Sequence, residues 1–240
     1  MAAILELEKV SKSYGALKVA DDVSFSVAPG EVLGILGPNG AGKTTLFNLI
    51  SGDVCADVGR VLFGGEDVTH RRPHQRCRMG IGRSYQIPQP FGGMTVFENL
   101  LVGATYGGAM SEAQADPVCI DILEKTGLGK KANLLAGSLT LLDRKRLELA
   151  RALATQPRVL LLDEIAGGLT EHEAVELVSL IKDIKMQGVT MIWIEHVVHA
   201  LLAVADRLLV INFGSKLAEG EPDAVMNDPE VKRVYMGIEV

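Results

Sequence analysis

This sequence has no long apolar run and no leader-like start, and these two absences exclude several classes of membrane and secreted protein. No apolar run approaches the roughly 20 residues that cross a bilayer, so we expect no spanning helix. The opening residues Met1–Glu6 lack a basic stretch followed by an apolar block, so we expect no signal peptide. If the protein serves a membrane, it works on the inner side and uses the spanning part of a partner.

Cysteine and basic residues are also scarce. Cys55, Cys77 and Cys119 are odd in number and lack C-x-x-C spacing, which predicts buried or idle thiols in a reducing cytosol. The net charge of −6 argues against a broad nucleic-acid surface and leaves a local basic patch open. No internal repeat, low-complexity tract or linker is present. The 240 residues, 48% of them hydrophobic, suit a chain with a sizeable buried core.

The apolar pattern alternates between strands and helices. Strands are predicted at Ile4–Val10, Val23–Val27, Val32–Leu36, Arg60–Phe63, Arg158–Leu162, Val189–Ile194 and Arg207–Asn212. Helices are predicted at Thr44–Ile50, Glu171–Met186, His199–Ala205 and Pro222–Tyr235. The stretch 88–156 has helices alone, with breaks near Pro117 and Gly127–Lys130. The alternation predicts an α/β fold with a mostly parallel sheet, interrupted by an inserted α-helical subdomain.

A phosphate-binding loop is the strongest motif in the chain. The segment Gly37–Thr44 reads G-P-N-G-A-G-K-T and fits the pattern G-x-x-x-x-G-K-[ST], between a buried strand and a helix. Glycines let backbone N–H groups approach a polyphosphate, and the helix directs its positive N-terminus at the same anion. Lys43 can reach the β- and γ-phosphates, and the Thr44 hydroxyl can ligate Mg²⁺.

Acidic and imidazole side chains follow two later buried strands. Asp163 ends the apolar run Val159–Leu162, where open α/β sheets bind ligands, and would hold Mg²⁺ through water. Glu164 can orient and polarise the attacking water, which favours hydrolysis over transfer to another substrate. His196 follows the next buried strand and can donate to the γ-phosphate. An unrelated P-loop kinase would leave Glu164 and His196 unexplained.

Taken together, these residues resemble the ATP-binding cassette (ABC) family over the whole chain. Tyr14 resembles the aromatic residue that stacks on adenine, Gln86 the glutamine that contacts Mg²⁺, and Leu147–Leu153 the helix after the signature motif. The resemblance implies one nucleotide-binding domain over 1–240, with a RecA-like P-loop NTPase core (1–87 and 157–240), an antiparallel β subdomain and the helical subdomain (88–156).

The resemblance also implies a set of site residues. The catalytic residues are Glu164 and His196, and the Mg²⁺ ligands are Thr44, Gln86 and Asp163. The ATP-binding residues are Tyr14, Gly37, Pro38, Asn39, Gly40, Ala41, Gly42, Lys43, Thr44, Thr45, Gln86 and Asp163. Members of the family work as dimers, in which two ATP molecules lie between the phosphate loop of one subunit and the signature motif of the other.

Three segments resemble the ATPases of branched-chain or hydrophobic amino-acid importers: Thr95–Gly103, Ile194–His196 and Val231–Gly237. The last also resembles the lipopolysaccharide-export ATPase, which stays open as the alternative, as does an ABC ATPase that acts on nucleic acid. The resemblance to importer ATPases implies that the protein lies on the cytoplasmic face of the inner membrane. It also implies transmembrane permease subunits as partners and an indirect link to a periplasmic substrate-binding protein.

The signature motif departs from the family pattern. The usual L-S-G-G-Q aligns with Leu139, Thr140, Leu141, Leu142 and Asp143. Thr140 can replace the serine hydroxyl, but the leucines obstruct close backbone approach to a phosphate, and Asp143 adds negative charge. Ile165 and Thr170 also replace a usual proline and aspartate. We therefore expect a heterodimer with a second ABC ATPase rather than a homodimer.

Overall fold

The structure is a computed structural model that describes residues 2–236, so Met1 and Gly237, named above, lie outside the described residues. A six-stranded sheet forms its centre, in the order β10-β9-β3-β8-β7-β6. All neighbours pair in parallel except β10, which is antiparallel to β9. The strands are β3 (Val32–Leu36), β6 (Ile81–Ser84), β7 (Val159–Asp163), β8 (Thr190–Ile194), β9 (Arg207–Asn212) and β10 (Ser215–Gly220).

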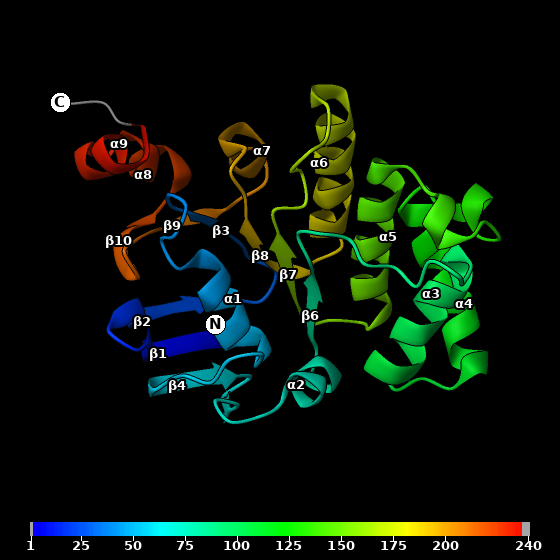
Figure 1. Cartoon of the computed structure of the whole chain (residues 1–240), viewed down its shortest axis with the longest axis horizontal. Helices are drawn as coiled ribbons and strands as arrows, with labels where there is room; N and C mark the ends of the chain where they lie inside the picture. Colours follow the sequence, from blue (N-terminus) through cyan, green and yellow to red (C-terminus); the bar gives the residue numbers. More distant parts are fainter. Residues whose placement is uncertain (1, 237–240) are drawn as a thin grey trace.

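A four-stranded antiparallel sheet lies beside the first, in the order β2-β1-β4-β5. Its strands are β1 (Leu5–Tyr14), β2 (Leu17–Val27), β4 (Val58–Phe63) and β5 (Glu66–Asp67). One face of β1, β2 and β4 joins the apolar side chains of helix α1 (Lys43–Ser51) and of the central sheet in a single buried cluster. This packing places α1, which begins at the phosphate loop, between the two sheets (Figure 1).

Helices cover the other face and one end of the central sheet. Helix α6 (Glu171–Met186) and helix α7 (Val198–Leu202) pack on β3, β7 and β8 in a second buried cluster. These strands are buried at every position, which explains their near-continuous apolar sequence. The C-terminal part forms α8 (Pro222–Asn227) and α9 (Pro229–Met236).

A separate group of helices lies beyond β6, on one side of the molecule (Figure 1). It comprises α3 (Val96–Val102), a π-helical turn at Gly103–Gly107, α4 (Glu112–Lys125) and α5 (Leu141–Ala154). These helices have their own buried cluster, which includes Leu100, Ile122 and Leu147. The arrangement matches the predicted α/β class with inserted helices; the exact subdomain limits stay a prediction.

Several local predictions differ from the structure. Pro117 lies inside α4 and does not end it, so the predicted break occurs only after Lys125. The predicted helix Pro222–Tyr235 is two helices, because Asp228 adopts an extended conformation before Pro229. The pattern missed β6, β10 and α2 (Pro73–Met79), whose short sequences mix polar and apolar residues without a clear period.

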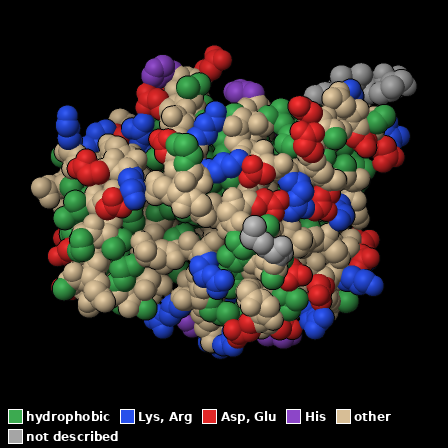
Figure 2. Space-filling view, turned by 180° about the vertical axis from the view of Figure 1, so that it is seen from behind, with side chains coloured by type: hydrophobic (Ala, Val, Ile, Leu, Met, Phe, Trp, Pro, Cys, Tyr) green, Lys and Arg blue, Asp and Glu red, His purple; other side chains and the backbone are tan. Residues whose placement is uncertain are grey.

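No helix within residues 2–236 combines the length and the apolar character that a bilayer span requires. On the face shown in Figure 2, acidic and basic side chains are interspersed, and hydrophobic side chains are scattered among them. Basic side chains are therefore not concentrated on the face in view.

Candidate active site

The phosphate loop connects β3 to α1 and has the backbone that its glycines predict. Gly42 has φ near +100°, and a Cβ atom there would lie 2.2 Å from the carbonyl oxygen of Val19. Only glycine can therefore bring the chain into α1 in this way. Lys43 is buried, and its Nζ donates to the carbonyl oxygens of Gly37 at 2.7 Å and Pro38 at 3.0 Å. The ammonium group thus lies within the curve of the loop.

Burial sets the electrostatics around this loop. Desolvation lowers the pKa of Lys43, and the carboxylates of Glu164 and Asp163 oppose that shift. Asp163, at the end of β7, is 4% exposed, and burial raises the pKa of its carboxyl group. Arg83 opposes this second shift, because its Nη2 donates to Oδ2 of Asp163 at 2.9 Å.

Glu164 lies at the meeting point of three loops. Its Oε2 accepts a hydrogen bond from Nε2 of Gln86 at 2.5 Å, and its Oε1 lies 2.7 Å from Nε2 of His196. The φ of Glu164 is +46°, a left-handed conformation that non-glycine residues rarely adopt and that often occurs at functional sites. The structure thus brings together Gln86, Glu164 and His196, which the sequence predicted as one site from three distant segments.

Oxygen donors suited to Mg²⁺ border the same space. Thr44 is exposed in the first turn of α1. Asp163 uses Oδ2 on Arg83 and Gln86 uses its amide nitrogen on Glu164, so within residues 2–236 the Oδ1 of Asp163 and the amide oxygen of Gln86 have no hydrogen-bond partner. Thr44, Gln86 and Asp163 line one cavity of about 570 Å³. Among the described residues, no group of three or more His, Cys, Asp or Glu could hold a metal. The hydroxyl, amide and carboxylate donors fit an ion that also binds phosphates.

Tyr14 lies at the end of β1 and is 52% exposed, with Nζ of Lys12 5.6 Å from its ring centre. Its ring is accessible to a flat ligand. Thr45 follows Thr44 in the first turn of α1 and is half-buried. The structure leaves the predicted roles of these residues untested.

Two supporting residues escaped the sequence analysis. Glu195 is 1% exposed, and its carboxylate accepts from the backbone N–H groups of Ala166 at 2.7 Å, His196 at 3.0 Å and Val197 at 3.4 Å. Its carboxylate therefore joins the loop after Glu164 to the loop of His196. The position of Glu195, an acid directly after the buried strand β8, is the same signal that identified Asp163.

Lys145 is the second missed residue. It is a buried residue of α5, and its Nζ lies 3.3 Å from the carbonyl oxygen of Gln86 and 3.5 Å from that of Glu164. Burial lowers the pKa of Lys145, and the carboxylates of Glu195 and Glu164 oppose that shift. A lysine on a helix normally reaches solvent, so no sequence signal distinguished it.

The signature-like segment forms the start of α5. Thr140 is the N-cap, and its Oγ1 accepts from the backbone N–H of Asp143 at 3.3 Å and donates to the carboxylate of Asp143 at 2.9 Å. Lys131 also donates to that carboxylate at 2.5 Å, so the charge of Asp143 is compensated within the chain. Leu141 is 45% exposed and Leu142 half-buried. Leu139 is buried in the helical cluster.

Comparison with known proteins agrees with this geometry. The ABC transporter family matches residues 20–167, and the branched-chain amino acid ATP-binding cassette transporter family matches residues 215–240. The lipopolysaccharide export system ATP-binding protein LptB of Haemophilus influenzae is 36% identical over 235 residues, which cover 98% of each chain. The high-affinity branched-chain amino acid transport ATP-binding protein LivG of Escherichia coli K12 is 34% identical over 249 aligned residues, again 98% of each chain.

A solved structure has the same fold. The ADP conformation of an ATP-binding cassette of an ABC transporter has a TM-score of 0.91 and 35% identity, and covers 99% of this chain and 100% of that one. The predicted P-loop NTPase fold is thereby confirmed. With a family match over most of the chain and relatives that align with nearly all of it, this protein belongs to the ABC transporter family and is one of its ATP-binding, ATP-hydrolysing subunits.

Proposed function

We propose that Glu164 is the main water-orienting group, that Thr44, Asp163 and Gln86 hold Mg²⁺, and that Lys43 and His196 bind the terminal phosphates. One observation supports this most directly: both carboxylate oxygens of Glu164 are engaged, one by Gln86 and the other by His196. A carboxylate held on two sides has a defined orientation, which general-base catalysis requires. Tyr14 provides the stacking surface for the base.

We further propose that the ATPase powers import of branched-chain or other hydrophobic amino acids from the cytoplasmic face of the inner membrane. The branched-chain family match over 215–240 and the likeness to LivG favour this cargo. LptB is as similar, so lipopolysaccharide export is the second candidate. Cargo depends on the membrane subunits, and in an importer also on a periplasmic binding protein, rather than on the ATPase.

Affinity purification of the tagged chain from native membranes tests the cargo. Amino-acid import predicts co-purified permease subunits, a second ABC ATPase and ATP-dependent uptake of leucine, isoleucine or valine after reconstitution. Co-purification with outer-membrane export components would instead favour the lipopolysaccharide reading. Recovery of nucleic acid or ribosomes without membrane subunits would contradict both.

The permease is proposed to dock beside Gln86. The cavity lined by Thr44 and Asp163 is also lined by Ile87 and Gln89, in the segment 87–94 that follows Gln86, and by Arg151 of α5. Ile87 is 68% and Phe91 46% exposed, so this segment offers apolar surface to a short helix of the partner. Cysteine cross-linking from position 91 to purified permease subunits is the test. Cross-links confined to this chain would contradict the docking role.

The second ATPase is proposed to differ from this chain. The hydroxyl of Thr140 is already bonded to Asp143 as the cap of α5, and the exposed side chain of Leu141 obstructs close approach of a phosphate to the N–H groups at this end of the helix. A partner with glycines in its own signature motif would complete the site around Lys43 and Glu164. Separate Glu→Gln changes at Glu164 and at the equivalent residue of the partner, with turnover measured in the assembled transporter, test this arrangement.

A further inference from the structure

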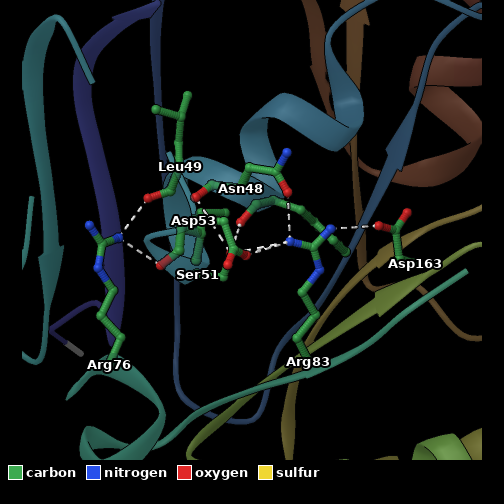
Figure 3. A network of polar contacts seen from close by, with 9 residues as sticks. Asn48, Leu49, Ser51, Asp53, Arg76, Arg83 and Asp163 are labelled. Carbon is green, nitrogen blue, oxygen red and sulfur yellow. Dashed lines mark hydrogen bonds and ion pairs between the residues drawn. The ribbon is translucent and has the colours of Figure 1, made fainter. Parts of the chain in front are cut away.

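Arg83 joins the end of α1 to the acid at the end of β7 (Figure 3). Its side chain is only 7% exposed, and its Nη2 donates to Oδ2 of Asp163 at 2.9 Å. Its Nη1 donates to Oδ1 of Asn48 at 2.7 Å and lies 3.2 Å from Oγ of Ser51 and from Oδ2 of Asp53. One guanidinium group therefore holds three side chains of the α1 end with one nitrogen and the carboxylate of β7 with the other.

The end of α1 is fixed independently by a second buried arginine. Nη1 of Arg76 donates to the carbonyl oxygens of Leu49 at 2.6 Å and Ile50 at 2.8 Å, which are unpaired groups of the last helical turn (Figure 3). Arg76 is 1% exposed. Because Arg76 anchors this end of α1, the Asn48 side chain that binds Arg83 has a fixed position. Arg83 therefore has a fixed position too, and it fixes the carboxylate of Asp163 in turn.

Aromatic rings complete the surroundings of Arg83. Its guanidinium carbon lies 4.8 Å from the ring centre of Tyr85 and 5.6 Å from that of Phe47. The flat guanidinium group therefore has ring contacts as well as hydrogen bonds, and these favour arginine over lysine at this position.

We propose that Arg83 is a positioning residue for the metal site. It fixes the position of Asp163 relative to Thr44 and offsets the negative charge of the Asp163 carboxylate. Thr44 lies in the first turn of α1 and Asp163 ends β7, so the two proposed ligands belong to different elements. Arg83 is bonded to the far end of the first element and directly to the second. This inference rests on the metal roles proposed above for Thr44 and Asp163.

Two effects of Arg83 can be separated by substitution. In R83M the buried carboxylate of Asp163 loses its cationic partner, so a divalent ion meets one positive charge fewer and binds the nucleotide-free chain more tightly. The same change removes the link to α1, so the ligand geometry loosens and turnover falls. In R83K the charge remains, but a single ammonium group cannot hold both Asn48 and Asp163 in the arginine geometry.

The experiment is a Mn²⁺ titration of the nucleotide-free chain by electron paramagnetic resonance, with MgATP turnover measured in the assembled transporter. For R83M we expect Mn²⁺ affinity to increase by about tenfold or more and turnover to fall by at least about tenfold. For R83K we expect wild-type Mn²⁺ affinity with reduced turnover. Thermal unfolding of each variant verifies that it is folded, and R60Q, which removes an exposed arginine on β4, is the matched control.

The outcomes distinguish the inference from the function on which it rests. D163N should abolish the extra Mn²⁺ binding of R83M; D163N with normal turnover would overturn the metal assignment itself. Impaired D163N together with wild-type Mn²⁺ affinity and turnover in R83M would overturn only the role of Arg83. If R83M does not fold, R83K and N48A decide, because both keep the charge and weaken the link; normal turnover in both contradicts the inference.

Discussion

Two parts of this chain that meet nucleotide in ABC ATPases differ in how their polar groups are used. Around Glu164, side chains from separate loops converge, and Gln86 and His196 bond to one carboxylate. At the start of α5, Thr140 and Asp143 bond to each other and leave the flanking Leu141 exposed. In the first region polar side chains of separate loops converge on one carboxylate, whereas in the second they bond to each other within the start of one helix. This difference supports the proposal that the chain uses a partner's signature motif rather than providing one.

The largest expected effect comes from Glu164, the carboxylate proposed to orient the attacking water. Glu164→Gln should leave ATP binding intact and reduce steady-state turnover of the assembled transporter by about 10²-fold or more, because an amide cannot act as a general base. Turnover and ATP affinity are measured side by side. Turnover above a tenth of normal would reject Glu164 as the main water-orienting group. The region around Glu164 would then no longer differ from the start of α5 in having a catalytic role.

The comparison itself is tested by the two ATP sites of the assembled transporter. We expect Glu164→Gln to reduce turnover at least about tenfold more than the same change in the partner ATPase, because hydrogen bonds left unmade to a charged phosphate cost about 1.5–3 kcal/mol each. The site that uses the signature-like segment of this chain should contribute little. Equal losses, or full activity of a pure homodimer of this chain, would contradict the asymmetry.

The organisation of the first region depends on a buried carboxylate. Glu195→Ala leaves the buried N–H of Ala166 and the part-buried N–H groups of His196 and Val197 without their acceptor, which should lower the free energy of unfolding by about 1–3 kcal/mol. We expect turnover to fall as well, because His196 loses its support. Urea unfolding and turnover measure the two effects; Glu195→Gln, which retains one acceptor oxygen, should recover part of both.

Glu195 also predicts a pH dependence. Burial raises the pKa of this carboxyl group above its ordinary value of 4.5, so the folded chain binds the proton more tightly than the unfolded chain. The contribution of Glu195 to the free energy of unfolding therefore decreases as the pH rises above about 4.5. Since Glu195→Gln does not titrate, its stability should decline less with rising pH than that of the wild type. Urea unfolding at several pH values from 4 upwards measures the difference, and parallel curves across the range just above pH 4.5 would contradict it.

The smallest expected effect concerns the second region. Thr140→Ala removes the N-cap of α5 and should lower the free energy of unfolding by about 1 kcal/mol. Thr95→Ala, which removes the same kind of cap from α3, is the matched control for stability. If the hydroxyl of Thr140 serves only the helix, both variants should retain similar turnover. A selective loss of turnover in Thr140→Ala would mean that this segment does provide a group to the partner's site.

Local patterns predicted the elements whose own sequence dictates their structure. The apolar run of β3, the capped helix α6 and strand β9 have the predicted limits, since each has a strong period or a clear terminus. Strand β6 was missed, because its residues Ile81–Ser84 are few and include the charged Arg83. That arginine is compatible with a buried strand only because Asp163 and the end of α1 receive it.

By itself, the sequence determined the family, the phosphate loop and the identity of the residues around it, because glycine spacing and strand-end acids are local features that any backbone of this fold must contain. Only the tertiary structure decided which groups pair. The bonds of Glu164 with Gln86 and His196, the acceptance of three N–H groups by Glu195, and the pairing of Asp143 with Lys131 join residues whose contact depends on how the loops pack. Electrostatic and hydrogen-bond energies depend on distance and burial, and neither quantity can be read from the order of residues along the chain.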